Sequence, residues 1–265
     1  MVNKVFESVD EAVAGIPDGV MIALHAWGGS GTPAYLIDAV RRLGIKDIAL
    51  VSPTFIPLPI FEGELPGPVS LLPQLKKVIT AGVGTRPFQS LDADFLADRV
   101  KNGELEIEMS THAILAERLH AGAMGLGGFY DPVGVGTIIE KGKEKRVIDG
   151  VEYIFQTPLR PDVALAHAYR ADTLGNLVFR GTARGTSPLH LMAAKLAIVE
   201  AEEIVAPGEL DPDSIHTPGI FVDRLVKIPA GGMASREHAM SIWQRIAENA
   251  LLKSIVFGAK KEDQQ

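Results

Sequence analysis

The chain has 265 residues, a mass of 28.4 kDa and a formal net charge of −7, from 26 lysines and arginines against 33 aspartates and glutamates. Hydrophobic residues make up 46% and charged residues 22%, which are ordinary globular values and exclude a mainly disordered chain. The negative balance argues against nucleic acid as a partner. Because the sequence has no cysteine, disulfides, thiolate metal sites and a cysteine nucleophile are excluded.

Two stretches bear on whether the chain enters a membrane. Residues 1–10 are charged and lack the apolar core of a secretion signal. Residues 48–61 are the most apolar stretch, but Pro53, Pro57 and Pro59 interrupt it and it is too short to span a bilayer. We therefore expect a soluble, cytoplasmic protein with no membrane partner.

The first half is predicted to alternate between strands and helices. A short apolar run at 20–24 predicts a buried strand, and the following helix has Thr32 as its N-cap, Pro33 as its first residue and Gly44 as its stop. Strands separated by helices predict an α/β fold with a mostly parallel sheet and helices on both faces. The further predicted elements are strands at 48–51, 78–81 and 105–109, and helices at 92–102 and 110–121, the latter ended by Gly122.

The second half is predicted to add β-hairpins. Asp149 and Gly150 form the turn of a hairpin over 146–156, and Leu174 and Gly175 separate two further strand-like runs, at 164–169 and 176–180. We divide the chain into an α/β domain at 1–230 and a helical extension at 231–265. The other predicted elements are a helix at 189–196, a strand at 198–205, an amphipathic helix at 235–253 and an irregular, proline-rich stretch at 53–73.

The first candidate binding segment is the glycine-rich loop between the first strand and the first helix. It contains His25, Trp27, Gly28, Gly29, Ser30 and Gly31. Ligands bind at the carboxyl edge of parallel sheets, where glycine allows a close approach and a helix N-terminus attracts anions. The spacing is neither the dinucleotide fingerprint nor a P-loop, so NAD and ATP are poor candidates.

His112 is the second candidate, because it follows the strand at 105–109 and begins the next helix at the same predicted edge as His25. A helix N-terminus favours the neutral imidazole, whose N–H can polarise a carbonyl. The alternative is that each histidine only fills a polar niche at a helix start, which is the commoner case for a single histidine. Two histidines at one edge favour a site.

The other polar groups carry less weight. No His-x-x-x-His or carboxylate-x-x-His spacing occurs, so we expect no metal site. His167 alternates within a strand, which is typical of a structural or interfacial residue. Glu106 and Glu108 share one strand face, either as acid–base carboxylates or, more commonly, as a solvated face.

From Asp18 and Gly19 through Gly31, Thr32 and Pro33, the chain resembles the N-terminal signature of the family I CoA-transferases. With the later matches it is similar to the A (α) subunit of the 3-oxoacid type, with a C-terminal extension more like that of glutaconate CoA-transferase. The later matches, in order, lie at 36–39, 102–106, 115–118, 129–130, 134–137, 171–172, 175–180, 199–200, 202–205, 208–210, 215–220 and 222–224.

The resemblance implies transfer of CoA between carboxylic acids through a glutamyl-CoA thioester, with an acyl-CoA thioester as substrate and no permanently bound cofactor. It also implies that the nucleophilic Glu belongs to a B (β) subunit, on a Ser-Glu-Asn-Gly segment. The corresponding Ser52, Pro53 and Thr54 include no Glu. This chain is therefore expected to be inert alone and to work in an A2B2 heterotetramer.

Two departures from the family pattern coincide with the two candidate histidines. His25, Ala26 and Trp27 stand where the signature has Gly-Gly-Phe, and His112 stands where the 3-oxoacid enzymes have an oxyanion-hole Gln. A hydrolase branch of the superfamily places an acid there and lacks the nucleophile. The sequence thus leaves open a transferase with an exchanged donor, a CoA-thioester or C–C hydrolase, and a non-catalytic CoA-binding subunit.

Overall fold

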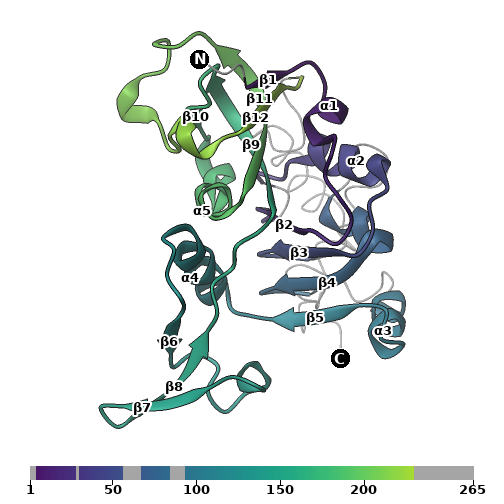
Figure 1. The fold of residues 1–265 in the computed structure, drawn as a ribbon, viewed down its shortest axis with the longest axis vertical. Coiled ribbons are helices and arrows are strands. Elements are labelled where there is room, and N and C mark those ends of the chain that lie inside the picture. Colours follow the sequence, from purple (N-terminus) through teal and green to yellow (C-terminus); the bar gives the residue numbers. More distant parts are fainter. Residues whose placement is uncertain (1–3, 28–29, 56–66, 84–92, 230–265) are drawn as a thin grey trace, which may run out of the picture.

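The computed structural model describes residues 4–27, 30–55, 67–83 and 93–229 (Figure 1). A nine-stranded sheet has the order β1-β12-β11-β9-β2-β3-β4-β5, with β10 paired to β9, and a three-stranded sheet has the order β6-β8-β7. The strands are β1 Val5–Phe6, β2 Met21–Leu24, β3 Ile48–Ser52, β4 Leu75–Thr80, β5 Glu106–Met109, β6 Phe129–Asp131, β7 Lys145–Ile148, β8 Val151–Gln156, β9 Val163–Asp172, β10 Leu177–Val178, β11 Leu196–Val205 and β12 Arg224–Lys227.

Neighbouring strands along the main path of the large sheet are parallel, and β10 joins it antiparallel. The predicted α/β class with a mostly parallel sheet is confirmed. The helices are α1 Val9–Val13, α2 Ala34–Leu43, α3 Ala93–Lys101, α4 His112–Ala123 and α5 Ser187–Ala193, and the 3-10 helices are η2 Pro68–Gln74, η3 Ile138–Glu140, η4 Gly181–Arg184, η5 Pro212–Ser214 and η6 Gly219–Phe221.

Helices cover both faces of the large sheet, as predicted. On β2, Ile22 and Leu24 pack into the cluster that contains α1 and α2, whereas Ala23 faces Leu115 and Leu119 of α4. This alternation follows from the two-residue period of a strand, which sends successive side chains to opposite faces. Both faces of β2 are buried, so its apolar residues run without interruption.

The predicted boundaries of the first helix are nearly correct. Pro33 is the residue before α2 rather than its first residue, and Gly44 ends the helix in the left-handed conformation, at φ 72°. Asp149 and Gly150 also form the predicted hairpin turn, both with positive φ, between β7 and β8. The second predicted hairpin is the antiparallel pair of β9 and β10.

The predicted end of α4 at Gly122 is wrong. The helix continues to Ala123 because Gly122 packs against the backbone of Leu159, where a Cβ would lie 1.8 Å from the carbonyl oxygen. Here the glycine permits a close approach instead of a turn.

The predicted helix at 189–196 is also displaced. Pro188 begins a shorter helix, α5, that ends at Ala193, and Leu196 is already the first residue of β11. A run of seven to eight apolar residues suits a helix or a buried strand equally well, and pairing of β11 with β9 decides the boundary.

The remaining expectations fall wholly or partly outside the described residues. The helix at 235–253 and the extension at 231–265 lie there, as does most of the proline-rich stretch at 53–73, of which η2 forms the end. Within the described part of the chain, no helix has the length and apolar character that crossing a membrane requires.

A buried carboxylate joins α2 to the centre of the sheet. Glu200 of β11 is 1% exposed and its Oε2 accepts a hydrogen bond of 2.9 Å from the backbone N–H of Leu36, in the first turn of α2. Its Oε1 lies 3.0 Å from Nδ1 of His167 on β9, whose Nε2 lies 3.2 Å from Glu202. The carboxylate thus satisfies a free amide of the helix start, where negative charge is favourable.

His167 supplies the positive charge that this buried cluster needs. Hydrogen bonds and charge attraction from Glu200 and Glu202 outweigh the opposing effect of burial, and raise the pKa of His167 to about 9. Burial raises the pKa of Glu200, while His167 and the α2 amides work against that rise. The expected structural role of His167 agrees with this placement.

The raised pKa of His167 predicts a loss of stability in alkaline solution. Because the folded pKa lies above the unfolded value, the stabilisation is fully present below about pH 6.5 and is lost as the pH rises through about 9. The contribution is at most about 3 kcal/mol. Urea unfolding between pH 6 and 9.5 should show the free energy of unfolding falling with pH in the wild type and falling less in His167→Gln. His120→Gln, at an exposed histidine of α4, is the matched control and should keep the wild-type slope; equal slopes in all three proteins would contradict the assignment.

Candidate functional site

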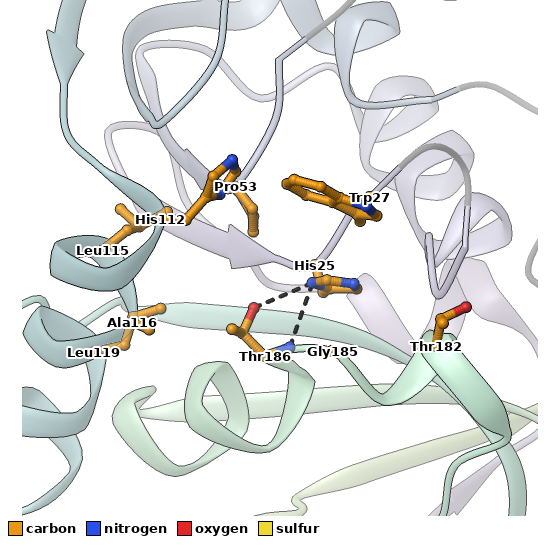
Figure 2. Close-up of a pocket in the computed structure, with 10 residues that line it drawn as sticks. All are labelled: His25, Trp27, Pro53, His112, Leu115, Ala116, Leu119, Thr182, Gly185 and Thr186. Carbon is orange, nitrogen blue, oxygen red and sulfur yellow. Dashed lines mark hydrogen bonds between the residues drawn. The ribbon is translucent and has the colours of Figure 1, made fainter.

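A cavity of about 460 Å³ opens at the carboxyl edge of the large sheet (Figure 2). It brings together His25 after β2, Pro53 after β3 and His112 at the start of α4. The strands that precede them are parallel, so their loops meet at this edge. The cavity is lined by His25, Trp27, Pro53, His112, Leu115, Ala116, Leu119, Thr182, Gly185 and Thr186.

One face of α4 forms a wall of the cavity. His112, Leu115, Ala116 and Leu119 are spaced i, i+3, i+4 and i+7, which places them along a single helix face. Thr111 caps the helix by accepting a hydrogen bond from the backbone N–H of Ile114. His112 therefore stands at the first helical position, as predicted.

His25 lies beneath Trp27 in Figure 2 and is buried, with 5% of its surface exposed. The backbone N–H of Thr186 donates to its Nδ1 at 3.4 Å, and the Thr186 hydroxyl lies 3.1 Å from the same atom. Because Nδ1 accepts, the neutral ring carries its proton on Nε2. That buried Nε2 has no hydrogen-bond partner among the described residues.

Burial and the neighbouring His112 lower the pKa of His25 to about 4. Burial also lowers the pKa of His112, and the N-terminus of α4 acts in the same direction. Both imidazoles are therefore neutral near pH 7, and each can donate one N–H hydrogen bond without adding a charge.

His190 supports the segment that holds His25. It is fully buried, its Nδ1 donates to the carbonyl of Thr186 at 2.8 Å, and burial lowers its pKa to about 3. Thr186 thus receives a hydrogen bond on its carbonyl from His190 and donates its N–H to His25. No sequence pattern links these two histidines, which are 165 residues apart in the chain.

Trp27 lies over the mouth of the cavity against His112. The two rings are 4.6 Å apart between centroids, at an interplanar angle of 70°, an edge-to-face contact. Trp27 is 49% exposed, which is high for so large an apolar side chain. The indole therefore presents open surface at the entrance.

The rest of the glycine-rich loop lies beside the cavity. The Ser30 hydroxyl is 3.0 Å from that of Thr182, and Gly31 packs on the backbone of Ala183, where a Cβ would lie 2.4 Å from the carbonyl oxygen. Neither lines the cavity. Gly28 and Gly29 lie outside the described residues. The amide of Leu36, at the helix start expected to attract an anion, already donates to Glu200.

The segment after β10 is the part of the site that the sequence did not predict. Thr182, Gly185 and Thr186 reach the cavity from more than 150 residues beyond His25. Gly185 has φ 37° and lies against the His25 ring, where an added Cβ would be 2.1 Å from Cε1. Two Gly-Thr pairs, at 181–182 and 185–186, were the only sequence signal for this loop.

The other candidate groups do not belong to the cavity. Glu106 and Glu108 bind Lys77, each at 2.8 Å, and Glu108 also binds Arg118, so they form a surface ion-pair network. His120 and His216 do not line the cavity either. Among the described residues, no group of three or more metal-ligating side chains is assembled.

Comparisons with known proteins agree with this architecture. A family model described as Coenzyme A transferase matches residues 6–228. The A chain of the succinyl-CoA:3-ketoacid coenzyme A transferase of Helicobacter pylori is 43% identical over 226 residues, which cover 85% of this chain and 92% of that protein.

Two solved structures share the fold. Glutaconate coenzyme A-transferase from Acidaminococcus fermentans has a TM-score of 0.69 at 20% identity, covering 98% of this chain and 90% of that chain. An acyl-CoA transferase from Escherichia coli O157:H7, in a thioester complex with CoA, has a TM-score of 0.71 at 20% identity, covering 87% of this chain. The match spans 48% of that longer chain. The extent of the family match and the identity to the Helicobacter protein show that this chain belongs to the coenzyme A transferase family and aligns with its A subunits.

Proposed function

We propose that this protein is the A (α) subunit of a cytoplasmic, heteromeric CoA-transferase that moves CoA between carboxylic acids, with His112 and His25 as hydrogen-bond donors to the reacting thioester. The observation that carries the proposal is the shared cavity, which gathers two neutral imidazoles at the carboxyl edge of a CoA-transferase fold. The catalytic Glu comes from a B subunit, and the assembly is an A2B2 heterotetramer.

The chemistry explains why neutral donors suit this site. When a carboxylate attacks the carbonyl carbon of a thioester, the C–O π electrons move onto the oxygen, which becomes negatively charged before the CoA thiolate leaves. An N–H held close to that oxygen stabilises the charge as it develops. His112 lies at the mouth of the cavity, next to the exposed face of Trp27, where a substrate from outside arrives.

The cavity of this chain does not provide the nucleophile by itself. Pro53 lines it at the position that corresponds to the nucleophilic Glu of the partner subunits. Hydrogen bonds hold this turn, from Ser52 Oγ to the carbonyl of Thr54 at 2.9 Å and from Thr54 Oγ1 to the carbonyl of Ala26. The cavity is also open to solvent on the side of Trp27, which leaves room for a partner to cover it.

The three-stranded sheet provides an apolar surface for such a partner. It lies apart from the large sheet, below α4 in Figure 1. Ile138 is 80% exposed, Val147 67% and Val151 47%, all on or beside this sheet. Exposed apolar patches of this kind are typical of protein–protein interfaces.

Replacing His112 tests its role as a donor. In the assembled complex, His112→Ala should lower kcat on the order of 10²–10³-fold with little change in KM, because one oxyanion donor is lost. His112→Gln should keep much of the activity, since an amide N–H can fill the same position. Steady-state kinetics of CoA transfer measure both.

The same variants separate transfer from hydrolysis. A general base must accept a proton, which an amide cannot do, so in a hydrolase His112→Gln would be as inactive as His112→Ala. A hydrolase would also show an acid limb in its pH–rate profile that disappears in the variant. Wild-type kinetics for His112→Ala would return His112 to a polar helix start without a role in the reaction.

Gly185 tests the positioning of His25. In Gly185→Ala the new Cβ would meet the His25 ring, so the ring must move and kcat should fall at least tenfold. Gly181→Ala is the matched control, because Gly181 also has positive φ but no atom lies within 4 Å of its added Cβ. Kinetics of the two complexes should differ although the backbone strain is similar; equal losses would show that strain alone is responsible.

Ile138 tests the partner surface. Ile138→Asp should weaken binding of the B subunit by at least tenfold, because a charge would be buried in an apolar contact. Ile220→Asp is the control, since Ile220 is 83% exposed but belongs to η6, away from the three-stranded sheet. Analytical ultracentrifugation of each variant mixed with the B subunit measures this, and equal association would place the interface elsewhere.

A further inference from the structure

The lining of the cavity is apolar and carries no fixed charge among the described residues. Leu115, Ala116 and Leu119 of α4 form one wall, with Pro53 and Trp27 on the other sides. The ionisable groups that line it are His25 and His112. Thr182 and Thr186 add hydroxyl groups, which are neutral.

The cation nearest in sequence to this wall is directed elsewhere. Arg118 lies on α4 between Ala116 and Leu119, but its Nε donates to the carbonyl of Thr157 at 2.7 Å and its Nη1 binds Glu108 at 2.5 Å. Arg118 is 5% exposed, so the surrounding chain holds it in these contacts. Its charge is therefore already paired on the side of α4 away from the cavity lining.

We infer that the cavity takes the acyl group of an uncharged, apolar acyl-CoA, and that Ala116 limits how large this group can be. The inference rests on the proposed function, since an acyl group enters only if CoA esters are substrates. It departs from the two relatives whose names specify succinyl and glutaconate groups, both of which bear a second carboxylate.

The physical argument is the cost of burying a charge. A second carboxylate in this cavity would give up its water and would find neutral imidazoles and hydrocarbon instead of a cation. Burial lowers the pKa of both histidines, so neither supplies that positive charge near pH 7. A hydrocarbon chain gains from leaving water in the same place.

Ala116 is suited to set the size limit because it is the smallest side chain on the α4 wall. It follows Leu115 and lies one turn after His112, so an acyl chain whose carbonyl is near His112 passes over it. A larger residue there would shorten the cavity without adding charge. The cavity volume of about 460 Å³ is within the usual range for small-molecule sites.

The first test uses a shape-matched pair of substrates with the assembled wild-type complex. 4-Methylpentanoyl-CoA has the branched outline of succinyl-CoA, with methyl groups in place of the carboxylate oxygens. At pH 7.5, with acetate as acceptor, kcat/KM should be at least tenfold higher for the methyl-branched ester. Equal values, or a preference for succinyl-CoA, would overturn the inference while leaving CoA transfer intact.

Calorimetric binding of the same two esters separates this inference from the proposed function. Tighter binding of the uncharged ester without any CoA transfer would support the cavity assignment and refute the transferase. Equal or tighter binding of succinyl-CoA would refute the cavity assignment, whichever reaction the complex performs.

The second test concerns Ala116. In Ala116→Leu, kcat/KM for hexanoyl-CoA should fall at least tenfold relative to acetyl-CoA. Ala113→Leu is the matched control, because Ala113 is an exposed residue of the same helix outside the cavity lining, and its chain-length profile should stay as in the wild type. An unchanged profile in Ala116→Leu, with the complex assembled, would remove Ala116 from the specificity site.

Discussion

The buried contact between Glu200 and the start of α2 supports much of this structure. The Glu200 carboxylate accepts a hydrogen bond from the amide of Leu36 and pairs with His167 on the neighbouring strand. These contacts join β9 and β11 to the helix that follows β2. Because the loop carrying His25 and Trp27 connects β2 to this helix, the buried charge also determines where both ends of that loop stand.

A buried ion pair of this kind stabilises a fold only when its groups are fully partnered. His167 contacts two carboxylates, and Glu200 contacts both a histidine and a helix amide. The arrangement also changes the meaning of the glycine-rich loop. A free helix N-terminus attracts an anionic ligand, whereas here part of that capacity is used within the protein, and the ligand cavity lies beside it.

The cavity itself has the opposite electrostatic character. Around His25 the protein supplies burial without a counter-charge, so the imidazole stays neutral and offers a donor that is not otherwise used among the described residues. The same chain thus stabilises a charged histidine at the centre of its sheet and neutral histidines at its edge. The difference follows from neighbours: carboxylates surround His167, whereas apolar side chains and threonines line the cavity around His25.

Local signals predicted those elements whose geometry depends on adjacent residues. Gly44 ends α2 because it adopts a left-handed conformation, and Asp149 and Gly150 form a tight turn between paired strands. Gly122 misled the same reasoning. Its role depends on Leu159, a residue far away in sequence that packs on it, and no local pattern reveals such a contact.

The sequence by itself determined the alternation of strands and helices, and hence a parallel sheet whose carboxyl edge carries His25 and His112. It also determined the family, through motifs spread along the chain. Only the tertiary structure decided that Thr186 holds His25, that Gly185 packs on its ring, and that one face of α4 makes the cavity apolar. These contacts join residues distant in the chain, and their geometry depends on how the sheet and its helices pack, which local spacing does not encode.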